Sequence, residues 1–159
     1  VDEMNKQAND LDKDAQEIVI TPSDAFTAIT VMTPTMSEYF EQWKLSSFVA
    51  GEGKQQEQGF VATSRLSDIA DILTGLDFTY EEIEPLIAGK NADQAEQTAA
   101  ELSRLVSTAV ELRDREAAGQ KFTPRQADQL GADMQAQAER IAGQVTQAAK
   151  DLDIEIQER

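Results

Sequence analysis

Apolar residues recur every third or fourth position along most of the chain, which is the spacing of helices that bury one face. The most regular run advances by alternating steps of three and four: Leu66, Ile69, Leu73, Leu76, Tyr80, Ile83 and Ile87. Two later runs keep helical spacing: Ala95, Ala99, Leu102, Val106, Ala109 and Leu112, then Leu130, Met134, Ala138, Ile141, Val145, Ala148 and Leu152. The pattern therefore predicts three long helices after residue 65.

An earlier helix is predicted to begin at Thr21-Pro22, because proline is favoured in the first turn of a helix. Its inward-facing candidates again lie mostly three or four positions apart: Phe26, Ile29, Met32, Met36, Tyr39, Phe40 and Trp43. Thr33-Pro34 interrupts this run, and Thr35 with Glu38 has the spacing of a capping box. We therefore expect a kink or a restart near Pro34.

Turn residues separate the predicted helices. Gly51 and Gly53 mark the first long connection, and residues 89–91 combine a helix stop with a new N-cap. Thr123-Pro124 is a clear start signal for the last helix. Four helices joined by short turns predict an all-α fold, an up-down-up-down four-helix bundle with a kinked first helix.

The division into domains follows from the first twenty residues. Residues 1–20 contain six acidic residues but only two lysines, and few branched apolar ones. Such a segment has little apolar surface to bury. We therefore expect a loosely docked acidic N-terminal arm, residues 1–20, followed by a single helical-bundle domain, residues 21–159.

Charge and composition narrow the function. The chain of 159 residues has 14 basic and 30 acidic residues and a formal net charge of −16, which argues against a nucleic-acid partner. It contains no Cys and no His, so thiolate nucleophiles, imidazole bases and Cys/His zinc sites are excluded. No run of apolar residues is long enough to span a membrane. Because the sequence begins at Val1, we expect that an export signal or lipid anchor has been removed.

The candidate chemistry lies in carboxylates. Asp77, Glu81 and Glu84 form a row at i, i+4 and i+7 beside the buried stripe, and no Lys or Arg lies between Arg65 and Lys90. A second carboxylate pair, Glu38 and Glu41, lies on the kinked first helix beside Tyr39 and Trp43, and in a bundle this pair is able to face the first group. Oxygen ligands suit hard cations such as Fe³⁺ or Ca²⁺, and helix bundles build metal sites from facing carboxylates. The alternative is a solvated acidic face that keeps the protein soluble.

The aromatic and methionine residues of the first half also have two interpretations. They are Phe26, Met32, Met36, Phe40, Trp43, Phe48 and Phe60. They either line a groove for an apolar ligand or form the core, and aromatic residues at helical spacing in a single domain favour the core.

Three stretches resemble the helical bundle of imelysin-like proteins, a group that includes periplasmic lipoproteins of bacterial ferrous-iron uptake. They are Thr63-Ser64-Arg65-Leu66-Ser67-Asp68-Ile69, Ala118-Gly119-Gln120-Lys121-Phe122-Thr123-Pro124, and Ile141-Ala142-Gly143-Gln144-Val145-Thr146-Gln147-Ala148-Ala149, within residues 60–150. The resemblance implies an exported, all-α, iron-associated protein working beside a membrane permease. The family's His-x-x-Glu motif is absent here, because the chain has no His. No metal ligand is therefore carried over.

These observations predict a non-enzymatic, extracytoplasmic binding protein, located in the periplasm or at the cell surface and associated with metal or iron uptake. The alternative is a structural or interaction module without a metal site, such as an accessory subunit of a membrane complex. A hydrolase using paired carboxylates is chemically feasible, but no pair in the sequence is placed across a cleft.

Overall fold

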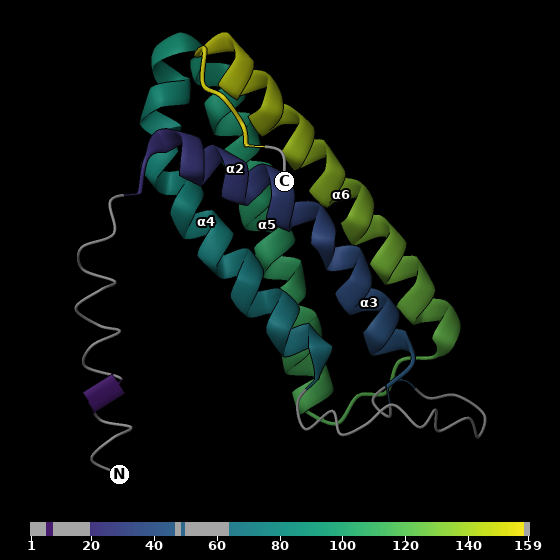
Figure 1. Cartoon of the computed structure of the whole chain (residues 1–159). Helices are drawn as coiled ribbons and strands as arrows, with labels where there is room; N and C mark the ends of the chain where they lie inside the picture. The colour runs from purple at the N-terminus through teal and green to yellow at the C-terminus, as the bar shows by residue number, and fades with distance from the viewer. Residues whose placement is uncertain (1–5, 8–19, 47–48, 50–63, 158–159) are drawn as a thin grey trace.

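The structure, a computed structural model, describes residues 6–7, 20–46, 49 and 64–157. The helices of the bundle are α2 (Pro22–Met32), η1 (Thr33–Thr35), α3 (Met36–Lys44), α4 (Arg65–Lys90), α5 (Ala92–Ala117) and α6 (Pro124–Asp151). α2, η1 and α3 follow one another directly and form one kinked first helix. Figure 1 shows this helix, α4, α5 and α6 running alternately down and up, so the predicted all-α bundle is confirmed.

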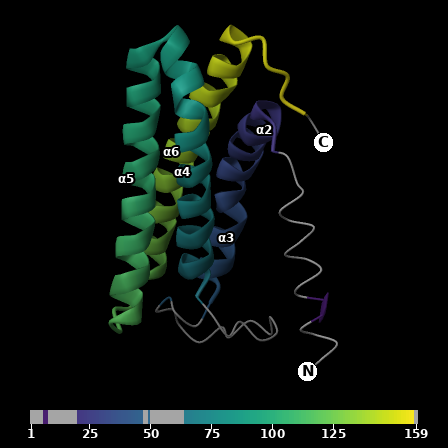
Figure 2. The same ribbon diagram turned by 90° about the vertical axis from the view of Figure 1, so that its left-hand side faces the viewer.

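Helix starts are fixed by the capping residues that the sequence indicates. Thr21 accepts a hydrogen bond from the backbone N–H of Asp24, whose carboxylate accepts one from the N–H of Thr21 in return. Thr123 and Gln126 form the same reciprocal capping box at the start of α6. Between α4 and α5, Asn91 alone ends one helix and caps the next. Such a tight connection makes α4 and α5 antiparallel neighbours (Figure 2).

The expected kink or restart near Pro34 is present as a short 3-10 turn, after which α3 begins at Met36. Thr35 keeps helical backbone angles and makes no cap with its side chain. Its hydroxyl instead donates to the carbonyl oxygen of Met32 at 2.6 Å, so the predicted capping box of Thr35 with Glu38 is wrong. An N-cap needs an extended backbone, and the chain here never leaves the helical region.

The core lies along the predicted seams, with shifts where a helix has two neighbours. Every residue of the α4 run from Leu66 to Ile87 is buried. In α5 the seam instead uses Thr98 and Leu105, while Ala99 and Val106 pack against the core only in part. This helix contacts both α4 and α6. Its buried face is therefore rotated about the helix axis relative to the face that spacing alone predicts.

The chain after α6 folds back onto the first helix. Leu152 ends α6, Asp153 has a positive φ of 56°, and the following residues run along α2 (Figure 1). The hydroxyl of Ser23 donates to the carbonyl oxygen of Glu155 at 2.5 Å, and the N–H of Gln157 donates to the hydroxyl of Thr27 at 3.1 Å. This segment therefore ties the start of the first helix to the end of the last one.

The predicted acidic arm lies mostly outside the described residues, as does the predicted connection around Gly51 and Gly53. The division into an arm and a bundle domain stays a prediction. Among the described helices, none combines the length and apolarity that a membrane span requires.

Candidate functional site

The predicted acidic row lies along one side of α4. The stripe from Leu66 to Ile87 is buried, which turns its neighbouring flank toward the edge of the bundle. On that flank Asp77 and Glu84 are half-buried and Glu81 is exposed. The three carboxylates therefore follow one another along one flank of α4. Asp77 is less exposed to solvent than Glu81.

Two ionisable groups on this part of α4, Asp77 and Tyr80, have raised pKa values. Burial raises the pKa of Asp77 above its ordinary value, and the charge of Glu81 raises it further. Burial also raises the pKa of Tyr80 to about 12, with a smaller contribution from the charge of Glu84. The Tyr80 hydroxyl donates to the carbonyl oxygen of Ala95 on α5 at 3.0 Å. A cation beside Asp77 and Glu81 would offset the repulsion between them.

Glu38 and Glu41 lie on α3, and both are exposed. Glu41 pairs with Lys44 at 2.6 Å, and the Nζ atom of Lys44 also binds Asp128 of α6 at 2.7 Å. These two carboxylates raise the pKa of Lys44. Lys44 thus holds Glu41 at a cleft of about 380 Å³ between α3 and α6, and not beside the acidic row of α4.

Within the described ranges, no group of three or more Asp or Glu side chains is close enough together to hold a metal ion by itself. The row of Asp77, Glu81 and Glu84 and the pair of Glu38 and Glu41 are therefore separate features. Their assignment to a metal ion stays a prediction.

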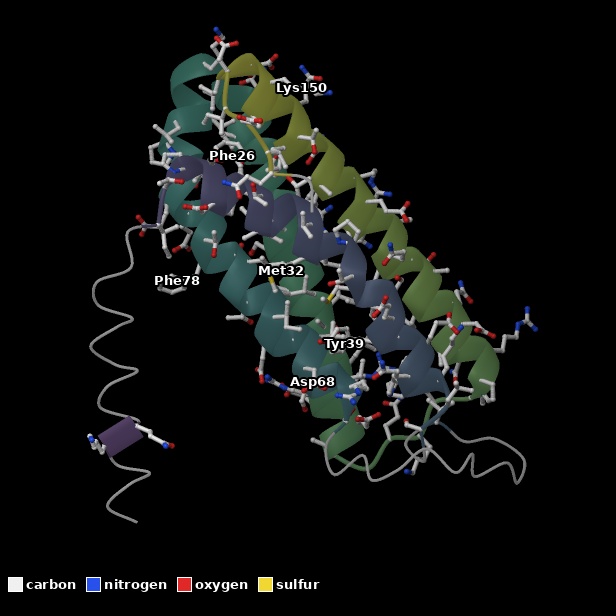
Figure 3. All side chains as sticks on the ribbon, viewed as in Figure 1. Phe26, Met32, Tyr39, Asp68, Phe78 and Lys150 are labelled. Atoms are coloured by element: carbon white, nitrogen blue, oxygen red, sulfur yellow. The ribbon has the colours of Figure 1, made fainter. Side chains whose placement is uncertain are left out.

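A second feature is an apolar groove of about 590 Å³ between the start of α2 and the middle of α4. Its walls include three exposed apolar side chains, with exposed fractions of 71% for Ile20, 69% for Phe78 and 43% for Leu86. Figure 3 shows Phe78 projecting from the side of α4, outside the bundle. Sequence reasoning did not single out this groove, because Phe78 lies off the seam and the lining comes from two helices.

The aromatic cluster is core where the structure describes it. Phe26, Met36, Phe40 and Trp43 are buried, whereas Phe48 and Phe60 lie outside the described residues. Met32 is the exception and is 42% exposed, so its prediction as an inward residue is wrong.

The position that Met32 was expected to fill is taken by a neighbouring residue. Thr33 continues the seam between Ile29 and Met36, with its hydroxyl donating to the carbonyl oxygen of Ile29 at 2.5 Å. At about 100° per residue, Thr33 lies within about 20° of Phe26 around the helix axis, whereas Met32 lies about 120° away from it. Two consecutive steps of three in α2 therefore turn Met32 outward.

A polar contact inside this core was not predicted. The Nε1 atom of Trp43 donates to the Oε2 atom of Glu116 at 2.7 Å, and Glu116 is only 8% exposed. Phe122 packs edge-on against Trp43, with ring centroids 5.3 Å apart. Spacing was the available signal, because Glu116 follows Ala109 and Leu112 in steps of three and four on the α5 seam.

Comparison with known proteins gives one match. The family model of imelysin, whose description carries a peptidase label, matches residues 1–148. No curated protein and no solved structure matches the chain. The match covers most of the chain, including residues before the three stretches that resemble the family. The chain therefore belongs to the imelysin family.

Proposed function

We propose that this protein is a non-enzymatic, extracytoplasmic binding protein of the imelysin family, associated with metal or iron uptake. Family membership supports the location, because imelysin-like proteins are generally extracytoplasmic. The net charge of −16 supports a positively charged ligand, because a surface of one sign concentrates ions of the other. A partner consistent with this role is a membrane permease.

The proposed ligand is a hard cation, Fe³⁺ or Ca²⁺. The observation that carries this proposal is the pair of Asp77 and Glu81, two carboxylates one helical turn apart on the half-buried flank of α4, where burial and the charge of Glu81 raise the pKa of Asp77. Carboxylate oxygens are the ligands that such ions prefer. With two carboxylates the coordination shell is completed mainly by water, so we expect weak binding, with a Kd for Ca²⁺ of about 0.1–1 mM.

The other predicted carboxylates have lesser roles in this proposal. Glu84 lies one turn beyond Glu81 and would act through bound water. Glu38 and Glu41 form a separate pair, and Glu41 already binds Lys44. We therefore assign them a secondary, lower-affinity association.

Calorimetric titration of the protein with Ca²⁺ and with chelated Fe³⁺ tests the site. We expect saturable binding that the double variant Asp77→Asn and Glu81→Gln abolishes. The matched control is Asp93→Asn with Glu96→Gln, which removes the same two charges from exposed positions of α5. Unsaturable heats, or equal binding by both double variants, would show that the carboxylates are only a solvated face.

The non-enzymatic part of the proposal rests on composition. A chain without Cys or His has neither a thiolate nucleophile nor an imidazole base for peptide hydrolysis. Incubation with a denatured protein and with a mixed peptide library, followed by mass spectrometry, checks this. New cleavage products that disappear with an Asp77→Asn variant would contradict the proposal and would support the family's peptidase label.

A structural or interaction module is the second candidate function. The exposed apolar groove of Ile20, Phe78 and Leu86 favours it, because exposed apolar patches mark contact surfaces. The bundle end that contains Phe40 and Trp43 does not offer such a surface, since both residues are buried. Absence of any metal binding, together with partner capture that Phe78→Asp abolishes, would favour this candidate.

A further inference from the structure

The groove between α2 and α4 combines exposed apolar side chains with carboxylates. Phe78, Glu82 and Leu86 line its α4 side at steps of four residues, so they fall within an arc of about 80° on one face of that helix. The exposed side chain of Ile20 lines the α2 side. Phe78 projects outward from this face in Figure 3. In water such an exposed apolar surface favours contact with another apolar surface.

The spacing of the apolar side chains fits a second helix. Phe78 and Leu86 are eight residues apart, which is about 12 Å along the axis of α4 at 1.5 Å per residue. Apolar side chains at positions i and i+7 or i+8 of an amphipathic helix are about 10–12 Å apart, so two of them match Phe78 and Leu86. An extended peptide fits less well, because a groove between two helices offers no strand edge for its backbone to pair with.

The charges on the α4 side of the groove are negative. Glu82 is exposed and lies one helical turn from both Phe78 and Leu86. The nearest basic residues of the chain before and after this part of α4 are Arg65 and Lys90, at the two ends of the helix. A partner that covers Phe78 and Leu86 therefore also brings its own side chains against Glu82.

The α2 side of the groove is also negative. The hydroxyl of Thr21, which lines the groove, donates to the carboxylate of Asp24 at 2.6 Å. Hydrogen bonds from Thr21 hold the pKa of Asp24 below its ordinary value, so this carboxylate is charged at neutral pH. Residues 20–43 contain no Lys or Arg. An apolar groove with carboxylates on both sides is complementary to a helix whose apolar face is flanked by Lys or Arg.

A second copy of this chain fits the groove less well. Each copy has a formal net charge of −16, and an isologous contact through this groove would bring Glu82 and Asp24 against the same carboxylates of the other copy. The charges therefore favour a separate, basic partner.

We propose that the groove between α2 and α4 is the docking site for a cationic amphipathic helix of another protein. The apolar face of this helix packs on Phe78, Leu86 and Ile20, and its Lys or Arg side chains pair with Glu82 and Asp24. The proposal rests on the interaction module described above as the second candidate function, and it names the chemistry of the partner. The proposed metal ligands Asp77 and Glu81 do not line the groove, so the two sites are tested separately.

Fluorescence anisotropy of a labelled model peptide, titrated with the full chain, tests the site. The probe is a helical peptide of about 18 residues with Leu at steps of three and four and Lys at the flanking positions. One control peptide replaces every Lys by Gln, and another has the composition of the probe in an order without an apolar face. We expect saturable binding of the probe that NaCl weakens, and binding at least about tenfold weaker for each control peptide.

Three variants of the protein locate the binding. Phe78→Ser removes apolar surface without adding charge, at a position exposed enough for the bundle to fold. Glu82→Lys reverses a charge in the groove, and its matched control Glu96→Lys makes the same change at an exposed position of α5. We expect Phe78→Ser and Glu82→Lys each to weaken probe binding at least about tenfold, and Glu96→Lys to weaken it by less than about twofold.

The controls define what would overturn the proposal. Equal binding of the Lys and Gln peptides would do so, because apolar contact alone would then select the occupant. Equal weakening by Glu82→Lys and Glu96→Lys would also do so, because the attraction would then belong to the acidic chain as a whole. A dimer in sedimentation without peptide that Phe78→Ser dissociates would make a second copy the occupant.

A calcium titration of Phe78→Ser separates this proposal from the metal site. The variant is expected to bind Ca²⁺ as the unaltered protein does, because Asp77 and Glu81 are unchanged. Loss of peptide binding with retained Ca²⁺ binding supports the groove as the docking site. Absence of probe binding to the unaltered protein contradicts the docking proposal alone, and absence of saturable Ca²⁺ binding contradicts the metal site alone.

Discussion

The buried contact between Trp43 and Glu116 makes the unfolding of this protein easy to follow. Trp43 is the single tryptophan, and Glu116 is its hydrogen-bond acceptor inside the core. Glu116→Ala removes the acceptor and leaves a buried N–H unpaired, so we expect a loss of about 1–3 kcal/mol in the free energy of unfolding. Urea denaturation followed by tryptophan fluorescence measures it.

Two further variants make this result specific. Glu116→Gln retains an acceptor oxygen and should lose clearly less stability than Glu116→Ala. Glu96→Ala, at an exposed position of α5, should change stability by no more than about 0.5 kcal/mol. If Glu116→Ala were as stable as the unaltered protein, the contact would be neutral and Trp43 would be held by packing alone.

Tyr80 links stability to alkaline pH. Its pKa is raised to about 12 in the folded protein, against about 10 for an unperturbed phenol. The unfolded chain therefore releases this proton first, so the stabilising contribution of Tyr80 is complete below pH 10 and is lost as the pH rises toward 12. We expect Tyr80→Phe to remove about 2 kcal/mol of the stability lost between pH 9 and pH 12.

Urea unfolding of both proteins at several pH values checks this expectation. Tyr80→Phe also loses the hydrogen bond to Ala95, which costs about 1 kcal/mol at neutral pH. The two stability curves should therefore approach each other above pH 10 and cross, so that Tyr80→Phe is the more stable protein by about 1 kcal/mol at pH 12. Parallel curves would mean that the phenol ionises equally readily in both states.

At the residue scale, the sequence predicted correctly where a side chain lies when its polarity matched its position on the helix, with apolar residues on the buried face and charged residues beside it. It placed Asp77, Glu81 and Glu84 together on one flank, because helical spacing alone determines that. It missed Glu116 and Thr33 as core residues, because both are polar residues at apolar seam positions. Glu116 finds its partner Trp43 through tertiary packing, and the Thr33 hydroxyl is satisfied by the carbonyl oxygen of Ile29 one turn earlier, so neither polar group is left unpaired in the core.

At the scale of single helices, two glycines of α6 offer a matched comparison. A Cβ atom at Gly143 would meet nothing within 4 Å, whereas one at Gly131 would lie 3.3 Å from the Cβ atom of Phe40. Alanine is favoured over glycine inside a helix by about 0.8–1 kcal/mol. We therefore expect Gly143→Ala to stabilise the protein by about that amount, and Gly131→Ala to gain less or to destabilise it.

Thermal unfolding followed by circular dichroism ranks the two variants. The expected order of melting temperature is Gly143→Ala above the unaltered protein, with Gly131→Ala below Gly143→Ala. An equal gain for both would show that α3 moves away from α6 at no cost, and that the close approach at Phe40 is not a constraint.

The capping signals of single helices show which local sequence patterns determine where a helix begins. The capping boxes at Thr21 and Thr123 were predictable, because each combines a cap residue, a proline and a polar partner within four positions. The signal at Thr35 misled, because the preceding turn stays helical across Pro34. The segment after Leu152 was not predicted. Its hydrogen bonds join residues 130 or more positions apart, and no local pattern records such contacts.

For the whole molecule, four periodic runs of apolar residues were sufficient to predict the bundle, because each run can bury its face only against neighbouring helices. The groove on α4 was not predictable in the same way. It is lined by residues at the start of α2 and along α4, so it depends on how these two helices pack against each other. The bundle thus follows from the apolar seams, whereas the groove depends on tertiary packing that the seams do not record.

The net charge of −16 is a property of the whole chain, and its effect on stability is measurable. Repulsion among like charges disfavours the compact state, and salt shortens its range from about 10 Å at 0.1 M to about 3 Å at 1 M. We expect the melting temperature to rise with NaCl by about 2–4 °C, which corresponds to about 1 kcal/mol for a domain of this size.

Calcium chloride at the same ionic strength separates screening from binding. If the stabilisation is screening alone, the two salts give the same melting temperature. If Asp77 and Glu81 bind the ion, calcium gives an additional rise, because a ligand of the folded state stabilises it by mass action. The double variant of these two residues removes only that additional rise. A melting temperature that does not change with NaCl would mean that ion pairs such as Lys44 with Asp128 lose as much from screening as the acidic surface gains.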